Sequence, residues 1–162
     1  MQALTQHDEL QELLRREVEC ASQLVDILRC EFETLKRGNG QSLQQIVAQK
    51  SQGINALAHL SSQRQQWLTA AGYPKADSAI DEYIQQVEAA LRMPIGELRR
   101  SLRALAEEAK RLNEINGGVI ETSRRYLEHA LAILQNRGAE VELYSPTAKT
   151  SYGPRSHSLG TV

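Results

Sequence analysis

Apolar residues recur along most of the chain at alternating steps of four and three positions, the repeat of helices that pack at a shallow angle. Four such rows predict helices over about residues 5–37, 42–71, 77–93 and 95–137. Each helix must bury its apolar face against another element. The pattern therefore predicts an all-α protein, an antiparallel bundle of long helices with coiled-coil-like seams.

Capping residues and helix breakers place the predicted helix ends. Ser42 begins an S-x-x-Q sequence that resembles a capping box, so the second helix is expected to begin there. Gly72 follows the last apolar position of that helix and is expected to cap its C-terminus. Pro94 lacks the N–H that a helix interior uses, and with Gly96 it predicts a break between the third and fourth helices.

Beyond residue 138 the apolar repeat vanishes, and Ser, Thr, Pro and Gly dominate the sequence. A segment of this composition cannot bury enough surface to offset the entropy of ordering it. We therefore predict a helical bundle over residues 1–138 and a flexible C-terminal tail over residues 139–162. Tyr144 and Tyr152 are conspicuous in this tail, because aromatic residues make up only 4% of the chain.

Composition narrows the class of protein. The chain has 162 residues, enough for one ordinary domain, and a net charge of −1, so no global field attracts nucleic acid. No run reaches the roughly eighteen apolar residues of a membrane span, and the N-terminus lacks a signal-peptide core. We expect a cytoplasmic protein with no nucleic-acid partner and no stable membrane insertion. Lys50 and Arg64 interrupt the apolar row of the second helix, and their charged ends are expected to reach water.

The sequence offers no candidate for catalysis or metal binding. None of His7, His59, His129 and His157 has a glutamate three residues before it, so the metal-binding pattern of helical bundles is missing. The chain has neither a phosphate-binding glycine loop nor a G-x-S-x-G motif. We therefore predict no cofactor, no metal and no enzymatic activity, and expect a protein that binds other proteins.

The sequence RLNEINGGVIETS, residues 111–123, places poor helix formers inside the fourth predicted helix. These are Asn113, Asn116, Gly117 and Gly118, and each Gly costs about 1 kcal/mol relative to Ala. Asn116 falls on the apolar seam, where a buried Asn can fix the register of packed helices. The two glycines permit either close approach of a neighbouring helix backbone or a bend between the bundle and the following segment, and both explanations stay open.

The chain resembles the FlgN family of flagellar type III export chaperones over its whole length. Two segments carry most of the resemblance, LQQIVAQKSQGINALAHLSSQRQQWLTAAGY at residues 43–73 and LNEINGGVIETSRRYLEHALAIL at residues 112–134. The most specific motif is N-x-x-N-G-x-x-I, formed by Asn113, Asn116, Gly117 and Ile120.

The resemblance implies a cytoplasmic chaperone for the hook-associated (hook–filament junction) proteins, of the FlgK and FlgL type. Such chaperones bind the C-terminal helical segments of their clients through their own C-terminal amphipathic helix, and so keep the clients unassembled before export. The client-binding residues implied here are Tyr126, Leu127, Ala130, Leu131, Ile133 and Leu134.

The resemblance also implies docking on the export gate protein FlhA through a tyrosine that follows this helix. Tyr144 has the matching position, but Ser145 and Pro146 follow it where the family commonly has glycines. Tyr152 precedes a glycine, so both tyrosines are kept as candidates. The alternative function is a structural coiled-coil adaptor that acts by self-association, and whether the free chain forms a homo-oligomer is left open.

Overall fold

The computed structural model describes residues 2–73 and 78–143, and the side chains of residues 7–73 and 78–134. The described residues form helices and no strand, which confirms the predicted all-α class. The helices are α1 (Gln2–Arg37), α2 (Gly40–Ala70), α3 (Ala79–Gln86) and α4 (Ala89–Leu143). The chain divides into two compact units, residues 1–121 and 122–162, and α4 contributes to both.

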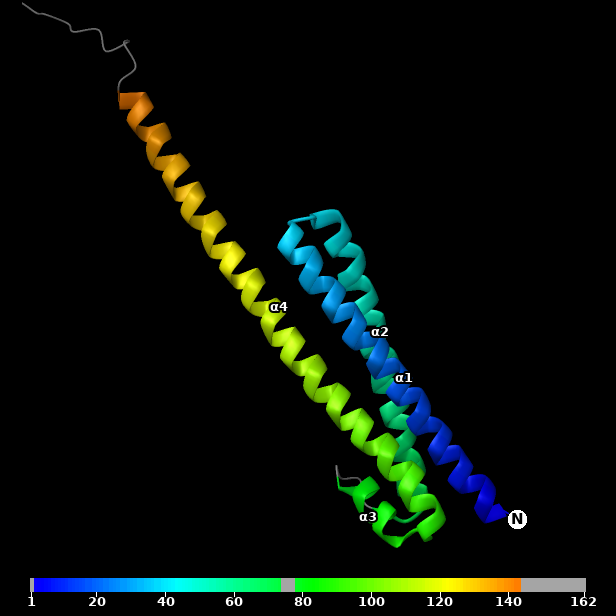
Figure 1. Cartoon of the computed structure of the whole chain (residues 1–162). Coiled ribbons are helices and arrows are strands. Elements are labelled where there is room, and N and C mark those ends of the chain that lie inside the picture. Colours follow the sequence, from blue (N-terminus) through cyan, green and yellow to red (C-terminus); the bar gives the residue numbers. More distant parts are fainter. Residues whose placement is uncertain (1, 74–77, 144–162) are drawn as a thin grey trace, which may run out of the picture. The chain divides into compact units, whose positions relative to one another are not determined.

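In the first unit, α1 and α2 form an antiparallel hairpin (Figure 1). Gly38 makes the turn with a φ of 67°, a left-handed conformation that glycine adopts without strain. Asn39 caps α2, because its side-chain oxygen accepts a hydrogen bond from the Ser42 backbone N–H at 3.1 Å. The second helix therefore begins at Gly40 rather than at Ser42, which supplies the capped N–H and is not itself the cap.

The end of α2 confirms the predicted role of Gly72, which has a φ of 92°. Its N–H donates to the Thr69 carbonyl at 3.1 Å, and the Tyr73 N–H donates to the Leu68 carbonyl at 3.0 Å. This pair of hydrogen bonds is a Schellman motif, which satisfies the last carbonyls of a helix and turns the chain away from its axis.

The break between the third and fourth helices lies at Val87 and Glu88, so the prediction of a break at Pro94 was wrong. Val87 is extended and buried. The Arg92 guanidinium donates to the carbonyls of Gln85 and Val87 at 3.1 and 3.2 Å, which satisfies groups that the end of α3 leaves unpaired. Pro94 lies inside α4 close to its start, where its ring removes one helical hydrogen bond.

Helix α4 ends at Leu143, beyond the predicted end at residue 137. Gly138 does not stop the helix, since one glycine costs about 1 kcal/mol and the sequence AEVEL that follows contains no breaker. Residues 139–143 of the predicted tail are therefore helical, and the rest of the tail lies outside the described residues. The compact units divide between residues 121 and 122, whereas the sequence placed the end of the bundle at residue 138.

The core of the first unit is built mainly from aliphatic side chains, which come from all four helices. Leu102 joins the buried cluster that contains Leu14, whereas Leu112 joins the cluster that contains Leu28. The first part of α4 therefore runs in the direction of α1 and antiparallel to α2. Successive long helices alternate in direction, as predicted.

A polar contact joins the three long helices inside this core. The Glu31 carboxylate of α1 is fully buried and accepts hydrogen bonds from Lys50 Nζ of α2 at 2.6 Å and from Asn116 Nδ2 of α4 at 2.7 Å. Asn116 Nδ2 also donates to the Leu28 carbonyl at 2.9 Å. Asn116 thus occupies the buried seam position that the sequence predicted, and its amide group bonds across helices.

A second buried carboxylate, Glu17, lies two heptads earlier on α1 and accepts a hydrogen bond from Arg64 Nε at 2.7 Å. Burial raises the pKa of Glu17, and the hydrogen bond and charge of Arg64 oppose that rise. The expectation that Lys50 and Arg64 reach water was wrong, since their side chains are only 20% and 14% exposed and each pairs with a buried carboxylate. Apolar spacing alone does not show which glutamates face inwards.

An aromatic cluster holds α3 against the ends of α1 and α2. The Tyr83 ring is 3% exposed and meets Trp67 and Tyr73 edge-on, with centroids 5.5 and 5.4 Å away. Such edge-to-face contacts are favourable beyond the area they bury. The Tyr83 hydroxyl forms a hydrogen bond with His7 Nδ1. Burial raises the pKa of Tyr83 to about 12.

Asn116→Leu is expected to lower the free energy of unfolding by about 2–3 kcal/mol, because the buried Glu31 carboxylate and Leu28 carbonyl each lose the hydrogen bond from Asn116. Urea unfolding followed by circular dichroism measures the change. Asn113→Leu is the matched control, since Asn113 is exposed on the same helix, and it should shift the value by less than about 0.5 kcal/mol. Full stability of the Asn116 variant would show that the hydrogen bonds of Asn116 contribute nothing to stability.

The Tyr83 hydroxyl is expected to make the fold sensitive to alkaline pH. Its pKa is about 12 in the folded chain against an ordinary value of 10.0, so the unfolded chain releases this proton first. The contribution is fully present below pH 10 and is lost as pH rises from 10 towards 12. Tyr83→Phe should show a shallower fall in unfolding free energy over this range, and identical pH profiles for the two proteins would contradict the assignment.

Candidate functional site

The second unit carries an exposed apolar surface on α4. Exposure ranges from 43% for Ile133 to 74% for Tyr126, and Ala130 is exposed as well. The members of this surface, here called the α4 apolar surface, are Tyr126, Leu127, Ala130, Leu131, Ile133 and Leu134. The structure thus brings together on one helix all the residues that the resemblance implied as client-binding.

Helical spacing places these side chains on one face. Leu127, Leu131 and Leu134 form one row at steps of four and three, and Tyr126, Ala130 and Ile133 form the neighbouring row. At 3.6 residues per turn the two rows together cover roughly 160° of the helix circumference. This is wider than the stripe of a simple two-helix seam, so the surface can contact more than one partner helix or a broad groove.

Charged residues bound the α4 apolar surface on the other side of the helix. Arg124 and Glu128 are one turn apart and form an ion pair. Because the charged and apolar faces are separated, this part of α4 is amphipathic. A contiguous exposed apolar face of this kind is typical of a protein interaction site.

The Asn and Gly residues before this surface do not form a tight helix crossing. Gly117 and Gly118 are exposed, and a Cβ built at either one meets no atom within 4 Å. The explanation by close backbone approach was therefore wrong for the described residues. Asn113 is also exposed, so of these four residues Asn116 alone is buried.

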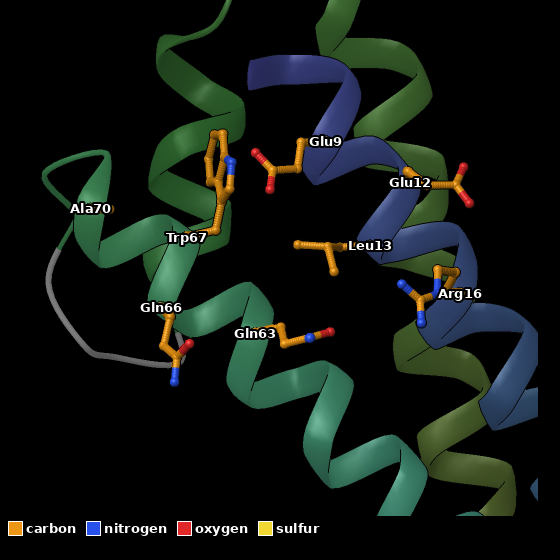
Figure 2. Close-up of a pocket in the computed structure, with 8 residues that line it drawn as sticks. All are labelled: Glu9, Glu12, Leu13, Arg16, Gln63, Gln66, Trp67 and Ala70. Carbon is orange, nitrogen blue, oxygen red and sulfur yellow. The ribbon is translucent and has the colours of Figure 1, made fainter. Parts of the chain in front are cut away.

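A cavity of about 550 Å³ lies between α1 and α2 on the hairpin. Figure 2 shows Glu9, Leu13 and Arg16 of α1 facing α2 across this opening. The full lining is Glu9, Glu12, Leu13, Arg16, Gln63, Gln66, Trp67 and Ala70. The lining offers carboxylate, guanidinium, amide and apolar groups, and no serine, cysteine, histidine or lysine.

The residues that the structure describes show neither a metal site nor a membrane-spanning helix. No group of three or more His, Cys, Asp or Glu among these residues is placed to hold a metal ion. None of the described helices combines the length and the apolar character needed to cross a membrane. The α4 apolar surface is therefore the candidate site.

Gly117→Ala/Gly118→Ala is expected to raise the free energy of unfolding by about 1–2 kcal/mol, because Ala favours the helix and each new Cβ points into open space. Urea unfolding of the double variant measures the gain. Gly72→Ala is the contrasting control, since its φ of 92° strains any residue with a Cβ and should lower stability. Destabilisation by the double substitution would mean that the glycines serve a conformation other than a regular helix.

Comparison with known proteins supplies the family. The family model described as FlgN protein matches residues 1–151. No curated protein and no solved structure matches the chain. Since the matched region covers both segments that carry the sequence resemblance and the whole of α1–α4, the chain belongs to the FlgN family of non-enzymatic, cytoplasmic chaperones for flagellar export.

Proposed function

We propose that this chaperone binds the C-terminal helical segments of its hook-associated client proteins, of the FlgK and FlgL type, through the α4 apolar surface. The observation that carries the proposal is the exposure of five large apolar side chains on one face of α4, from Tyr126 to Leu134. A soluble chain that keeps such a surface uncovered gains free energy when a partner removes it from water.

The chemistry of the surface fits an amphipathic helix as its ligand. Two parallel rows at heptad spacing present leucine knobs and the gaps between them, the arrangement into which another helix packs its own apolar side chains. A client segment that is disordered when free would fold on this surface. While it is bound, its apolar face is unavailable for assembly with other subunits, which keeps the client unassembled.

The expected energy is sufficient for reversible capture. Burial of one leucine side chain contributes roughly 1.5–3 kcal/mol, and several such side chains lie on this surface. Ordering the client segment opposes part of that gain. The balance favours a complex that forms readily and can still be released at the export machinery.

Delivery to the export gate protein FlhA is assigned to a tyrosine beyond α4, Tyr144 or Tyr152. Both lie outside the described residues. We further propose that the segment after residue 143 serves docking rather than folding, since it lacks the apolar repeat of the helices. The other explanation of Gly117 and Gly118, a bend between the bundle and the client-binding segment, is also part of this proposal; in the free chain α4 runs through both glycines as one helix.

A structural coiled-coil adaptor remains the competing function. The same exposed rows could pair with a second copy of the chain, which would seal the α4 apolar surface permanently. A homo-oligomer of that kind would leave no free surface for a client. Light scattering on the free protein and on a mixture with a client peptide separates the two functions.

Leu127→Ser/Leu131→Ser is expected to weaken binding of a peptide from the C-terminus of a hook-associated protein by about a hundredfold or more, because two leucines leave the interface. Isothermal titration calorimetry measures the affinity, and a melting curve confirms that the variant is folded.

Val47→Ser/Ile54→Ser is the matched control, since it removes two apolar side chains that are 45% and 49% exposed on α2. This variant should bind the peptide with nearly unchanged affinity. If the α4 variant binds as well as the control, the client site lies elsewhere on the chain.

A further inference from the structure

A second candidate binding surface, rich in arginine, lies in the first unit between α3 and the start of α4. The structure has a cavity of about 250 Å³ at this place. Its lining, here called the α3–α4 basic groove, consists of Asp81, Ile84, Gly96, Arg99, Arg100 and Arg103. None of these residues belongs to the α4 apolar surface, and the function proposed above does not use them.

The positive charges of the groove outnumber the negative ones. Arg99 Nε lies 3.3 Å from Asp81 Oδ1, and Arg103 Nη2 lies 3.8 Å from Asp81 Oδ2. One carboxylate is therefore shared by two guanidinium groups. Arg100 donates from Nε to the Gly96 carbonyl at 3.4 Å and has no carboxylate partner among the described side chains. The lining thus carries three guanidinium groups for a single carboxylate.

Arg100 and Arg103 are exposed and can contact a partner, whereas Arg99 is not. The Arg99 side chain is 19% exposed and is held by Asp81, whereas the Arg103 side chain is 64% exposed. Arg100 is exposed as well. A guanidinium with free N–H groups binds carboxylates in a bidentate geometry. Arg100 and Arg103 therefore offer the recognition chemistry, and Arg99 with Asp81 forms the fixed wall beside them.

Apolar contacts are available next to these charges. Ile84 is half-buried in the lining, and a Cβ built at Gly96 meets no atom within 4 Å, which leaves room beside the arginines. Met93 is 64% exposed one turn before Gly96, on the same face as Arg100. Methionine and arginine are enriched in protein interfaces, where methionine adapts its shape to the partner.

We propose that the α3–α4 basic groove binds an acidic segment of a partner protein, with carboxylates on Arg100 and Arg103 and an apolar side chain against Met93. Charge complementarity argues for the carboxylates, and the apolar neighbours argue for a polypeptide. Nucleic acid fits less well, because Glu97 and Glu107 on the same helix interrupt the positive surface that a row of phosphates requires.

The test uses the full chain and a short labelled peptide of alternating Glu-Glu and Leu residues, with counterparts that carry Gln or Lys in place of Glu. Fluorescence anisotropy measures binding. The Glu peptide should bind about tenfold or more tightly than the Gln peptide at low salt and lose that advantage near 0.3 M salt, as expected for exposed charges. Arg100→Glu/Arg103→Glu should abolish the preference for Glu and bind the Lys peptide instead.

Two controls make the result decisive. Arg15→Glu/Arg29→Glu changes the net charge equally at arginines that are 58% exposed on α1, and should keep the Glu preference. Arg100→Gln/Arg103→Gln removes the charge but keeps polar side chains, and should lose the preference even if charge reversal disturbs the fold. Equal binding of the three peptides, an equal loss in the α1 control, or displacement of the Glu peptide by duplex DNA at matched charge would overturn the proposal.

Discussion

The buried Glu31 carboxylate sets the arrangement of the three long helices, because a charge without access to water needs partners from the elements that surround it. Lys50 supplies the opposite charge from α2, and Asn116 supplies an N–H from α4. Rows of leucines at heptad spacing pack almost as well after a slide of one turn, about 5.4 Å, because similar residues recur. A slide would separate Glu31 from its partners and leave a buried charge unpaired, which costs several kcal/mol. The polar contact therefore selects one register among those that apolar packing permits.

Side-chain burial along α4 changes at this contact. Up to Asn116 the seam residues of α4, such as Leu102 and Leu112, are buried or half-buried, whereas between residues 117 and 134 no side chain is buried. One uninterrupted helical pattern thus serves first as core and then as an exposed apolar surface. Side-chain burial holds the first part, while helix propensity and charge pairs such as Arg124–Glu128 support the second. This division suits the proposed role of the α4 apolar surface, because a surface outside the core can be covered or uncovered without disturbing the core.

The chain belongs to a non-enzymatic family, so its surfaces matter as places where other proteins can bind. The cavity between α1 and α2 has a lining of amides, charged groups and a few apolar groups. The α4 apolar surface offers instead a broad face suited to another helix. The α3–α4 basic groove differs in chemistry, since it combines arginines with an exposed methionine. Two surfaces of different character would let one small protein distinguish two kinds of partner.

Local sequence determined the class of fold, most of the helix pattern and the apolar rows. The repeat of leucines and the φ of Gly72 depend on neighbours within a turn or two, so the sequence displays them directly. The α4 apolar surface could also be predicted from the sequence. Its two rows lie on one helix, within a segment that carries the family resemblance. The break between α3 and α4 could not be predicted from periodicity, since the Arg92 guanidinium that satisfies the carbonyls of Gln85 and Val87 lies in the next helix.

Tertiary structure alone decided which polar groups lie inside. Glu31 is fully buried and Glu33 is 51% exposed, although both are glutamates of one helix, and only the placement of the other helices separates them. The open space beside Gly117 was likewise invisible in the sequence, because close approach and free surface favour the same residue. Glu31 and Asn116 are 85 positions apart in the chain and 2.7 Å apart in the fold. A hydrogen bond between such distant residues forms only once packing has brought their helices together, so no local sequence pattern predicts it.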